Sequence, residues 1–310
     1  MSTSTSTLSP TKRKRRADYY QLATNRIIAL LEKGVPPWRK SWGSYGLARN
    51  YASGHVYQGI NMFMLNLVAP YEVPLYMSKK QVAAQGGNIV EGSKPEWVYF
   101  YGDYYKDASG NTVPIDQVAA RTETGEKLQH IRFLRTRPIY NVSCVEGVEI
   151  EISTMPKREN NPIEACESLL KKFDPKPNYG ETDTDSPAYI PSCDRIRLPS
   201  KEYFDNSEEF YCTLFHEIVH WTGHATRLNR VGVSSDKASF GSKLYAEEEL
   251  IAEFGASYLC TITGIDREAI MENSAAYIQA WIKRLKKDKK MIFRVSARAQ
   301  QAITFLMGEE

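Results

Sequence analysis

The sequence predicts an α+β protein, with a small sheet among helices in its first half and a mainly helical second half. Residues 97–142 contain aromatic and β-branched runs separated by Gly, Pro and Asn, which indicates antiparallel strands. From residue 207 onward, apolar residues recur at helical spacing. Because no apolar run reaches the roughly 18 residues of a membrane-spanning helix, we do not expect a membrane partner.

The chain is long enough for two ordinary domains, since it has 310 residues of which 42% are hydrophobic. Residues 1–16 are rich in Ser and Thr and then basic, and we expect a disordered arm there. A helix over 17–33 follows, stopped by one Gly and two Pro. We place the boundary between the domains near 149–161, which gives a first domain of residues 17–150 and a second of residues 151–310.

The remaining elements follow from the same patterns of periodicity and turn residues. Ser207, followed by two acidic residues, is the predicted N-cap of a long helix. A stretch rich in Pro, Asp and Thr at 174–187 breaks all periodicity and predicts a surface loop. Strands are predicted at 97–101, 131–134, 139–142, 189–190 and 196–198, and helices at 61–68, 207–221, 245–263 and 275–288.

The net charge of +3 averages two halves of opposite sign. Residues 1–150 carry 19 Lys and Arg against 12 Asp and Glu, or +7, and the remainder carries −4. The basic half is therefore expected to bind a polyanion. The five cysteines are scattered without a CxxC pair, and no apolar segment of a signal peptide follows the basic arm. We therefore expect a cytoplasmic protein without a disulfide framework or a Cys-based zinc site.

Residues 216–220, His-Glu-Ile-Val-His, form an HExxH motif. Two His four residues apart on a helix project from one face, so both imidazoles can bind one Zn²⁺. Glu217 would lie beside the open coordination position and accept a proton from water, which predicts metal-assisted hydrolysis. Such a donor set also accepts Mn²⁺ or Co²⁺. The alternative is a core helix that carries two hydrogen-bonded histidines.

A hydrolytic zinc site needs a third protein ligand, and the helix over 245–263 supplies the candidates. Glu249 and Glu253 lie one turn apart on one face of that helix. We predict that Glu249 binds the metal and that Glu253 accepts the free N–H of a ligating His. Glu247 and Glu248 point elsewhere, and we expect both on a solvated face.

Three further features surround the predicted metal site. Tyr245, one turn before Glu249, is the nearest phenol in sequence that could stabilise an oxyanion, although a core tyrosine is the alternative. His224 continues the spacing of the two histidines, but Gly223 is expected to end the helix, so we expect His224 to contact the ligands or the substrate instead of the metal. The extended segment 188–198 is a candidate for pairing with a peptide substrate.

The basic half interleaves cations with aromatic side chains. Cations that follow phosphates and aromatic faces that stack on unpaired bases are typical of single-stranded DNA binding. The alternative is that these aromatics are ordinary core. No helix-turn-helix, zinc-finger or RNP pattern is present, so we expect no sequence-specific readout. The predicted contacts are Trp38, Arg39, Lys40, Trp42, Arg49, Tyr57, Lys79 and Lys80, with a further cationic stretch at Arg132, Arg135 and Arg137 beside Phe133.

These motifs together resemble those of the ArdC-type antirestriction proteins of conjugative plasmids. The segments that resemble the N-terminal single-stranded-DNA-binding domain of the family are 37–42 (PWRKSW), 54–61 (GHVYQGIN), Gln81 with the glycines at 86–87, and 140–142 (YNV). Those that resemble its C-terminal zincin-like metallopeptidase domain are 216–224 (HEIVHWTGH), 227–230 (RLNR) and the glutamate-rich run before Phe254. The resemblance covers roughly residues 17–300.

The resemblance implies a small α+β DNA-binding domain followed by a mainly helical zincin-like domain. It implies a protein of a mobile element that protects incoming DNA from restriction during conjugation. In this reading His216 and His220 are ligands, Glu217 is the base, Glu249 is the acidic ligand, and Asn61 joins the DNA contacts. The expected partners are single-stranded DNA and a DNA-bound protein or restriction endonuclease. The alternative is a non-catalytic module that shields single-stranded DNA and holds a structural metal ion.

Overall fold

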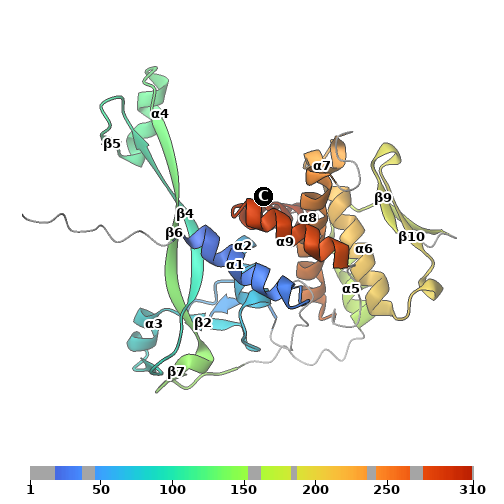
Figure 1. Ribbon diagram of the computed structural model, residues 1–310, viewed down its shortest axis with the longest axis horizontal. Coiled ribbons are helices and arrows are strands. Elements are labelled where there is room, and N and C mark those ends of the chain that lie inside the picture. The colour runs from blue at the N-terminus through green and yellow to red at the C-terminus, as the bar shows by residue number, and fades with distance from the viewer. Residues whose placement is uncertain are drawn as a thin grey trace, which may run out of the picture.

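The computed structural model describes residues 18–36, 46–152, 162–182, 187–235, 242–265 and 275–308. The predicted arm at 1–16 lies outside these ranges, as do Trp38, Arg39, Lys40 and Trp42. The predicted fold class is confirmed, because sheets occupy the first half and helices dominate the second (Figure 1). Among the described residues, no helix combines the length and apolar character needed to cross a membrane.

A five-stranded sheet in the order β1-β2-β6-β4-β5 dominates the first half. β4 (Glu96–Lys106) and β6 (Gln129–Asn141) pair antiparallel over eleven residues and form a long ribbon (Figure 1). The prediction of two strands in place of β6 is wrong. Pro138 does not interrupt β6, because β2 pairs with it only from Tyr140 onward and a free strand edge tolerates proline.

The shorter elements of the first half surround this ribbon. α1 (Tyr19–Glu32) matches the predicted first helix, and its N-cap is Asp18, whose carboxylate accepts the N–H of Gln21. The predicted helix at 61–68 is divided into α2 (Gly59–Met62) and a π-helical segment, Phe63–Val68. The others are β1 (Arg49–Asn50), β2 (Leu75–Met77), α3 (Lys79–Ala84), β5 (Thr112–Val113), α4 (Ile115–Glu123) and the separate pair β3 (Asn88–Ile89) and β7 (Val145–Glu146).

A three-stranded sheet in the order β8-β10-β9 opens the second half. β9 (Ala188–Ile190) and β10 (Arg195–Pro199) match the predicted strands, and β9 is an edge strand. The predicted loop at 174–187 contains β8 (Tyr179–Thr182), which pairs in parallel with β10. Periodicity did not reveal β8, because its pairing depends on backbone hydrogen bonds to residues seventeen positions further along the chain.

In the described part of the second half, three α-helices agree with the predictions and three were not predicted. α6 (Ser207–Thr222), α8 (Lys243–Thr263) and α9 (Ala275–Lys287) lie where they were expected. The missed helices are α5 (Pro162–Lys172) and α10 (Met291–Leu306), and a four-residue helix, α7 (Val231–Ser234), precedes α8.

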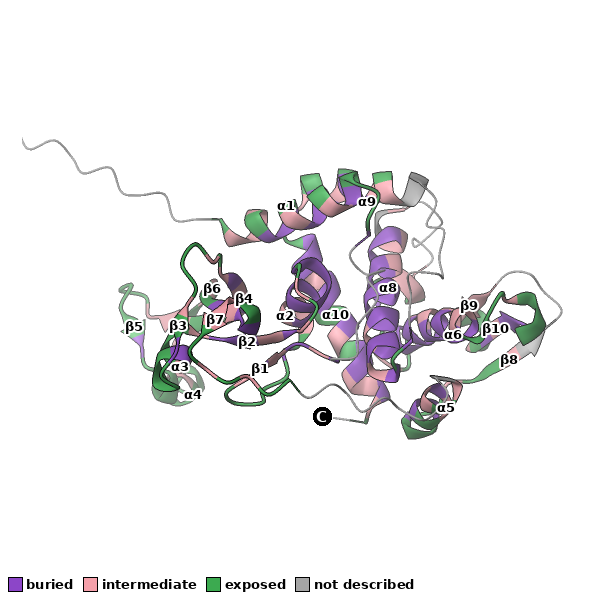
Figure 2. Ribbon diagram, turned by 90° about the horizontal axis from the view of Figure 1, so that it is seen from below, coloured by how far each residue is buried: buried purple, intermediate pink, exposed green. Residues whose placement is uncertain are grey.

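One hydrophobic core joins the two halves. Buried residues concentrate on α6, α8 and α10 (Figure 2). Phe63 of the first half stacks on Phe254 of α8 with ring centroids 3.9 Å apart. The close approach of α8 to α6 depends on Gly255, where a Cβ atom would lie 2.5 Å from Cγ2 of Val219. This approach brings the predicted metal ligands of the two helices face to face.

Candidate metal centre and nucleic-acid contacts

Helix α6 carries the HExxH motif between two defined ends. Its N-cap is Asn206, whose side chain accepts the N–H of Glu209 at 2.8 Å, and not the predicted Ser207. Asparagine and serine both favour the N-cap position, so the asparagine one residue earlier takes the place of the predicted serine. The helix ends at Thr222 with Gly223 as its C-cap, as predicted.

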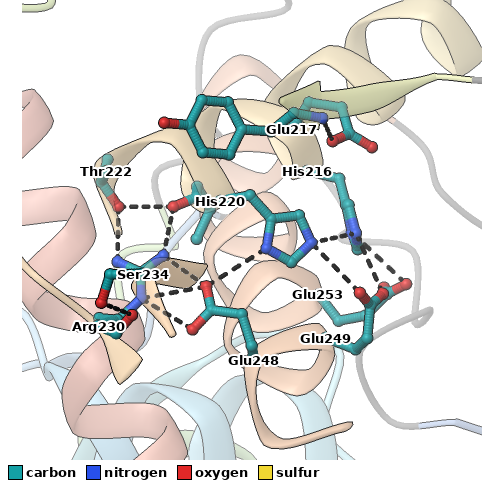
Figure 3. A network of polar contacts seen from close by, with 11 residues as sticks. His216, Glu217, His220, Thr222, Arg230, Ser234, Glu248, Glu249 and Glu253 are labelled. Atoms are coloured by element: carbon teal, nitrogen blue, oxygen red, sulfur yellow. Dashed lines mark hydrogen bonds and ion pairs between the residues drawn. The ribbon is translucent and has the colours of Figure 1, made fainter. Parts of the chain in front are cut away.

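The ligand atoms of His216, His220 and Glu249 converge between α6 and α8 (Figure 3). The two Nε2 atoms are 3.1 Å apart. Oε2 of Glu249 lies 3.6 Å from Nε2 of His216, and Oε1 of Glu249 lies 3.5 Å from Nε2 of His220. Ligands bound tetrahedrally at about 2.0–2.1 Å would be roughly 3.3 Å apart. These three side chains therefore fit a metal ion.

The electrostatics of the cluster also favour a cation. Burial lowers the pKa of His216, but the close contact with the Glu249 carboxylate and the charges of three nearby glutamates outweigh burial and raise this pKa to about 9. Burial raises the pKa of Glu249, but the two histidines and a hydrogen bond from Tyr245 reverse the effect and lower it to about 2. A site that stabilises positive charge on its own ligands is suited to a metal cation.

Each histidine has a carboxylate beside its second ring nitrogen. Oε1 of Glu253 lies 3.8 Å from Nδ1 of His216, close enough for an ion pair but too far for a hydrogen bond. Oε1 of Glu248 lies 3.3 Å from Nδ1 of His220. The predicted solvated face for Glu247 and Glu248 is wrong, because both are buried. Carboxylates in this position orient ligating histidines.

Arg230 explains how Glu248 can be buried. Its guanidinium, itself buried, donates to the Glu248 carboxylate at 2.7 Å, to the carbonyl of Val219 at 2.6 Å and to the hydroxyl of Thr222 at 2.7 Å (Figure 3). The pairing tethers the loop after α6 to α8. The position of Arg230 in the sequence does not connect it to Glu248, because only tertiary packing brings the two side chains together.

The carboxylate of Glu217 lies against the edge strand β9. It is buried, and Oε2 accepts the backbone N–H of Tyr189 at 2.6 Å. Arg227 fixes this strand: it donates to Asp194 at 2.9 Å and to the carbonyl of Trp221 at 2.8 Å, and it stacks on the Trp221 ring at 3.8 Å. Asp194 in turn accepts the hydroxyl of Tyr189 at 2.8 Å.

A cleft of about 420 Å³ opens beside the ligands. Tyr245 lines it and bonds to Glu249, so its phenol lies next to the predicted metal. The other lining groups are small or apolar apart from the ligands and their acidic neighbours, as Ala188, Pro191 and Val233 illustrate. His224 does not join the ligand atoms, and its Nδ1 bonds the hydroxyl of Thr226 at 2.8 Å.

The predicted DNA contacts within the described residues occupy unlike environments. Tyr57 is buried in a small apolar cluster with Tyr76. The side chain of Asn61 donates to the carbonyl of Tyr99 at 2.7 Å and accepts its N–H at 2.6 Å. Arg49 is half-buried in β1, whereas Lys79 and Lys80 are exposed on α3. Tyr57 and Asn61 are thus engaged within the fold.

Two family profiles match the chain. The profile of the N-terminal domain of the anti-restriction factor ArdC matches residues 17–142. The profile of a zincin-like metallopeptidase family matches residues 166–298, which include all three candidate ligands.

The solved structures that resemble this one are of the antirestriction protein ArdC from the R388 plasmid. Its metal-free form is 29% identical with a TM-score of 0.71 and covers 94% of this chain and 97% of its own. Its Mn(II)-bound form is 30% identical with the same TM-score and covers 94% and 98%.

Curated relatives include longer proteins. A DNA primase TraC of Escherichia coli is 30% identical over 313 residues, and a second TraC is 31% identical over 309 residues. Each match covers 94% of this chain, but the chain spans only 27% and 20% of the two primases. The protein y4eC of Sinorhizobium fredii is 27% identical, and the match covers 94% of this chain and 92% of y4eC.

Proposed function

Because the chain belongs to the ArdC family of antirestriction proteins, we propose that it protects the incoming DNA of a mobile element from restriction during conjugation. In this proposal it acts in the recipient cytoplasm. The first domain, residues 17–150, binds single-stranded DNA, and the second domain, residues 151–310, acts on a DNA-bound protein or a restriction endonuclease. The basic charge of the first half supports the first role, and the ligand cluster supports the second.

His216, His220 and Glu249 are the proposed metal ligands, with Zn²⁺ or Mn²⁺ as the bound ion. A metal ion in such a site acidifies water and polarises a carbonyl group, which is the chemistry of metal-assisted hydrolysis. Three protein ligands beside a cleft favour a catalytic site over a structural one, because a structural zinc site is closed by four. Glu248 orients the imidazole of His220 through its contact with Nδ1, and the charge of Glu253 lies near Nδ1 of His216.

The protein side chains perform the remaining work. Glu217 takes a proton from water as general base, and the N–H of Tyr189 holds its carboxylate in place. The edge strand β9 can pair with an extended peptide, since none of the strands that the structure describes lies on its outer side. Tyr245 is the proposed hydrogen-bond donor to the oxyanion that forms from the attacked carbonyl group. To reach that oxygen, its phenol gives up the hydrogen bond to Glu249.

The observation that carries this proposal is the convergence of three ligand atoms beside Glu217 and the cleft. Its test is the survival of an unmodified plasmid that enters a restricting recipient. Glu217→Gln should abolish protection while metal content and folding stay unchanged, because the ligands are intact. Glu208→Gln, on the first turn of the same helix, is the matched control and should protect fully. Full protection by metal-loaded Glu217→Gln would exclude hydrolysis as the cause.

A further inference from the structure

The β4–β6 ribbon has two unlike faces. On the face that we call inner, aromatic residues of β4 contact the helices. Trp97 packs on Tyr19 of α1 with ring centroids 5.4 Å apart, and Tyr99 packs on Phe293 of α10 at 5.3 Å. Tyr101 accepts a hydrogen bond from Tyr20 of α1 at 3.3 Å. Because alternate residues of a strand point to opposite sides, their neighbours in sequence lie on the other face.

The other face, which we call outer, carries five side chains of a different kind: Phe100, Tyr104, Phe133, Arg135 and Arg137. The guanidinium of Arg137 lies 5.4 Å from the ring centroid of Phe100, and that of Arg135 lies 4.6 Å from Phe133. Phe133 in turn contacts Tyr104 edge to face at 5.6 Å. The register places all five on one side, since Phe100 pairs with Arg135 and the positions alternate from there.

Gly102 makes this arrangement possible. A Cβ atom on Gly102 would lie 2.7 Å from Cζ of Phe133 and 3.1 Å from Nε of Arg135. The Phe133 ring therefore lies across the backbone of β4 with Arg135 against it. The outer face is a built stack of rings and guanidinium planes.

The two faces also differ in charge. On the inner face, Nε of Arg132 lies 3.1 Å from Oδ1 of Asp103, and His130 lies 2.9 Å from the same atom. On the outer face, Arg135 and Arg137 are exposed, and no carboxylate of the described residues lies within ion-pair distance of either. The positive charge of the outer face is thus left for an external anion.

We propose that this outer face is where the protein binds single-stranded DNA, an inference that rests on the proposed function and specifies its surface. The arginines contact phosphates and stack on bases, and the aromatic rings stack on bases that a duplex would keep paired. The engagement of Tyr57 and Asn61 within the fold is consistent with a binding surface on the ribbon. We assign single-stranded DNA because binding of duplex DNA needs only cations, whereas exposed aromatic rings stack on unpaired bases.

The test is a fluorescence-anisotropy titration of the full chain with a labelled 20-nucleotide oligo-dT over a series of salt concentrations. The double variant Arg135→Ala/Arg137→Ala should bind at least about 10-fold more weakly and lose about 1.4 from the slope of log affinity against log salt, at about 0.7 per phosphate contact. The control is Arg121→Ala on α4, a residue outside the predicted contacts. It should bind within about 2-fold of wild type, because Glu126 already pairs with that arginine at 3.2 Å.

Two further variants separate stacking from charge and guard against misfolding. Phe133→Leu keeps the apolar contact but loses the ring, and it should weaken binding by about 5- to 100-fold with an unchanged salt slope. Arg135→Lys/Arg137→Lys keeps the charge and should retain the salt slope while affinity falls. Metal binding by each variant, measured separately, reports that the second half is folded.

The outcomes distinguish the surface from the wider proposal. If wild type and the double alanine variant bound with equal affinity, or if Arg121→Ala lost as much affinity as the double variant, the assignment of the outer face would be overturned while DNA binding stands. Equal affinity of wild type for a blunt 20-base-pair duplex would overturn the single-strand assignment. Failure of wild type to bind either DNA would overturn both this inference and the proposed DNA-binding role.

Discussion

Glu248 of α8 and His220 of α6 meet across the interface of the two helices, with Oε1 of the carboxylate 3.3 Å from Nδ1 of the ring. A carboxylate in this position accepts the N–H of Nδ1, which leaves the lone pair of Nε2 directed at His216 and Glu249. The contact therefore selects the imidazole tautomer that can bind a metal. Arg230 keeps Glu248 charged in a buried place by pairing with it at 2.7 Å.

The first prediction concerns metal affinity. Glu248→Gln should weaken Zn²⁺ or Mn²⁺ binding by about 10- to 100-fold, the usual loss when the partner of a ligating histidine is removed. Competition against a chromophoric chelator measures the affinity. Glu247→Gln is the matched control, because this neighbouring buried glutamate pairs with Arg294 and Arg298 instead of a histidine. Equal losses in the two variants would contradict the role given to Glu248.

Arg230 gives a prediction about stability. Arg230→Met should lower the free energy of unfolding by about 3–5 kcal/mol, because it leaves a buried carboxylate without its cation. Lys286→Ala removes an ion pair whose side chains are 57% and 50% exposed, and it should cost at most about 1 kcal/mol. Urea denaturation of the metal-free protein measures both. A cost below 1 kcal/mol for Arg230→Met would mean that Glu248 is not held as an ion.

Bound metal should raise the free energy of unfolding by an amount that grows with the ratio of free metal to the dissociation constant. At a free concentration of 100 times the dissociation constant, the gain is about 2.7 kcal/mol, because the ion binds only the folded chain. Thermal unfolding with and without Mn²⁺ or Zn²⁺ measures the gain. His216→Ala removes one of the three ligands and should abolish the shift. An equal shift in this variant would indicate that the ion binds elsewhere.

The sequence predicted the ligand set better than its surroundings, for a physical reason. HExxH is a local pattern, so helical geometry alone brings His216 and His220 together, and the one-turn spacing of Glu249 and Glu253 selected the face of α8. The contacts of Glu248 with His220 and Arg230 join residues 28 and 18 positions apart in the chain, and only tertiary packing determines them. The same holds for Tyr57, whose aromatic ring suggested stacking on DNA but is buried in the core.

The edge strand gives a prediction about local dynamics. Arg227→Lys removes the forked pairing with Asp194 and the stacking on Trp221, which a lysine ammonium cannot reproduce. The bond from Tyr189 to Glu217 should then open more often, and exchange of the Tyr189 amide hydrogen should rise by about 10- to 100-fold, as expected for a lost contact to a charged group. Hydrogen-exchange NMR measures the rate. Arg195→Lys, on the exposed side of β10, should leave it unchanged.

Gly255 links the packing of the helices to the metal site. In Gly255→Ala the added methyl group would lie 2.5 Å from Cγ2 of Val219, so α8 must move away from α6 at a cost of about 1–3 kcal/mol. Glu249 lies six residues earlier on α8 and would retreat from His216 and His220, so metal affinity should fall together with stability. The double variant Gly255→Ala/Val219→Ala makes room for the methyl group and should recover part of both quantities, which a double-mutant cycle quantifies. If the double variant recovered stability but not metal affinity, the spacing of α6 and α8 would not determine the positions of the metal ligands.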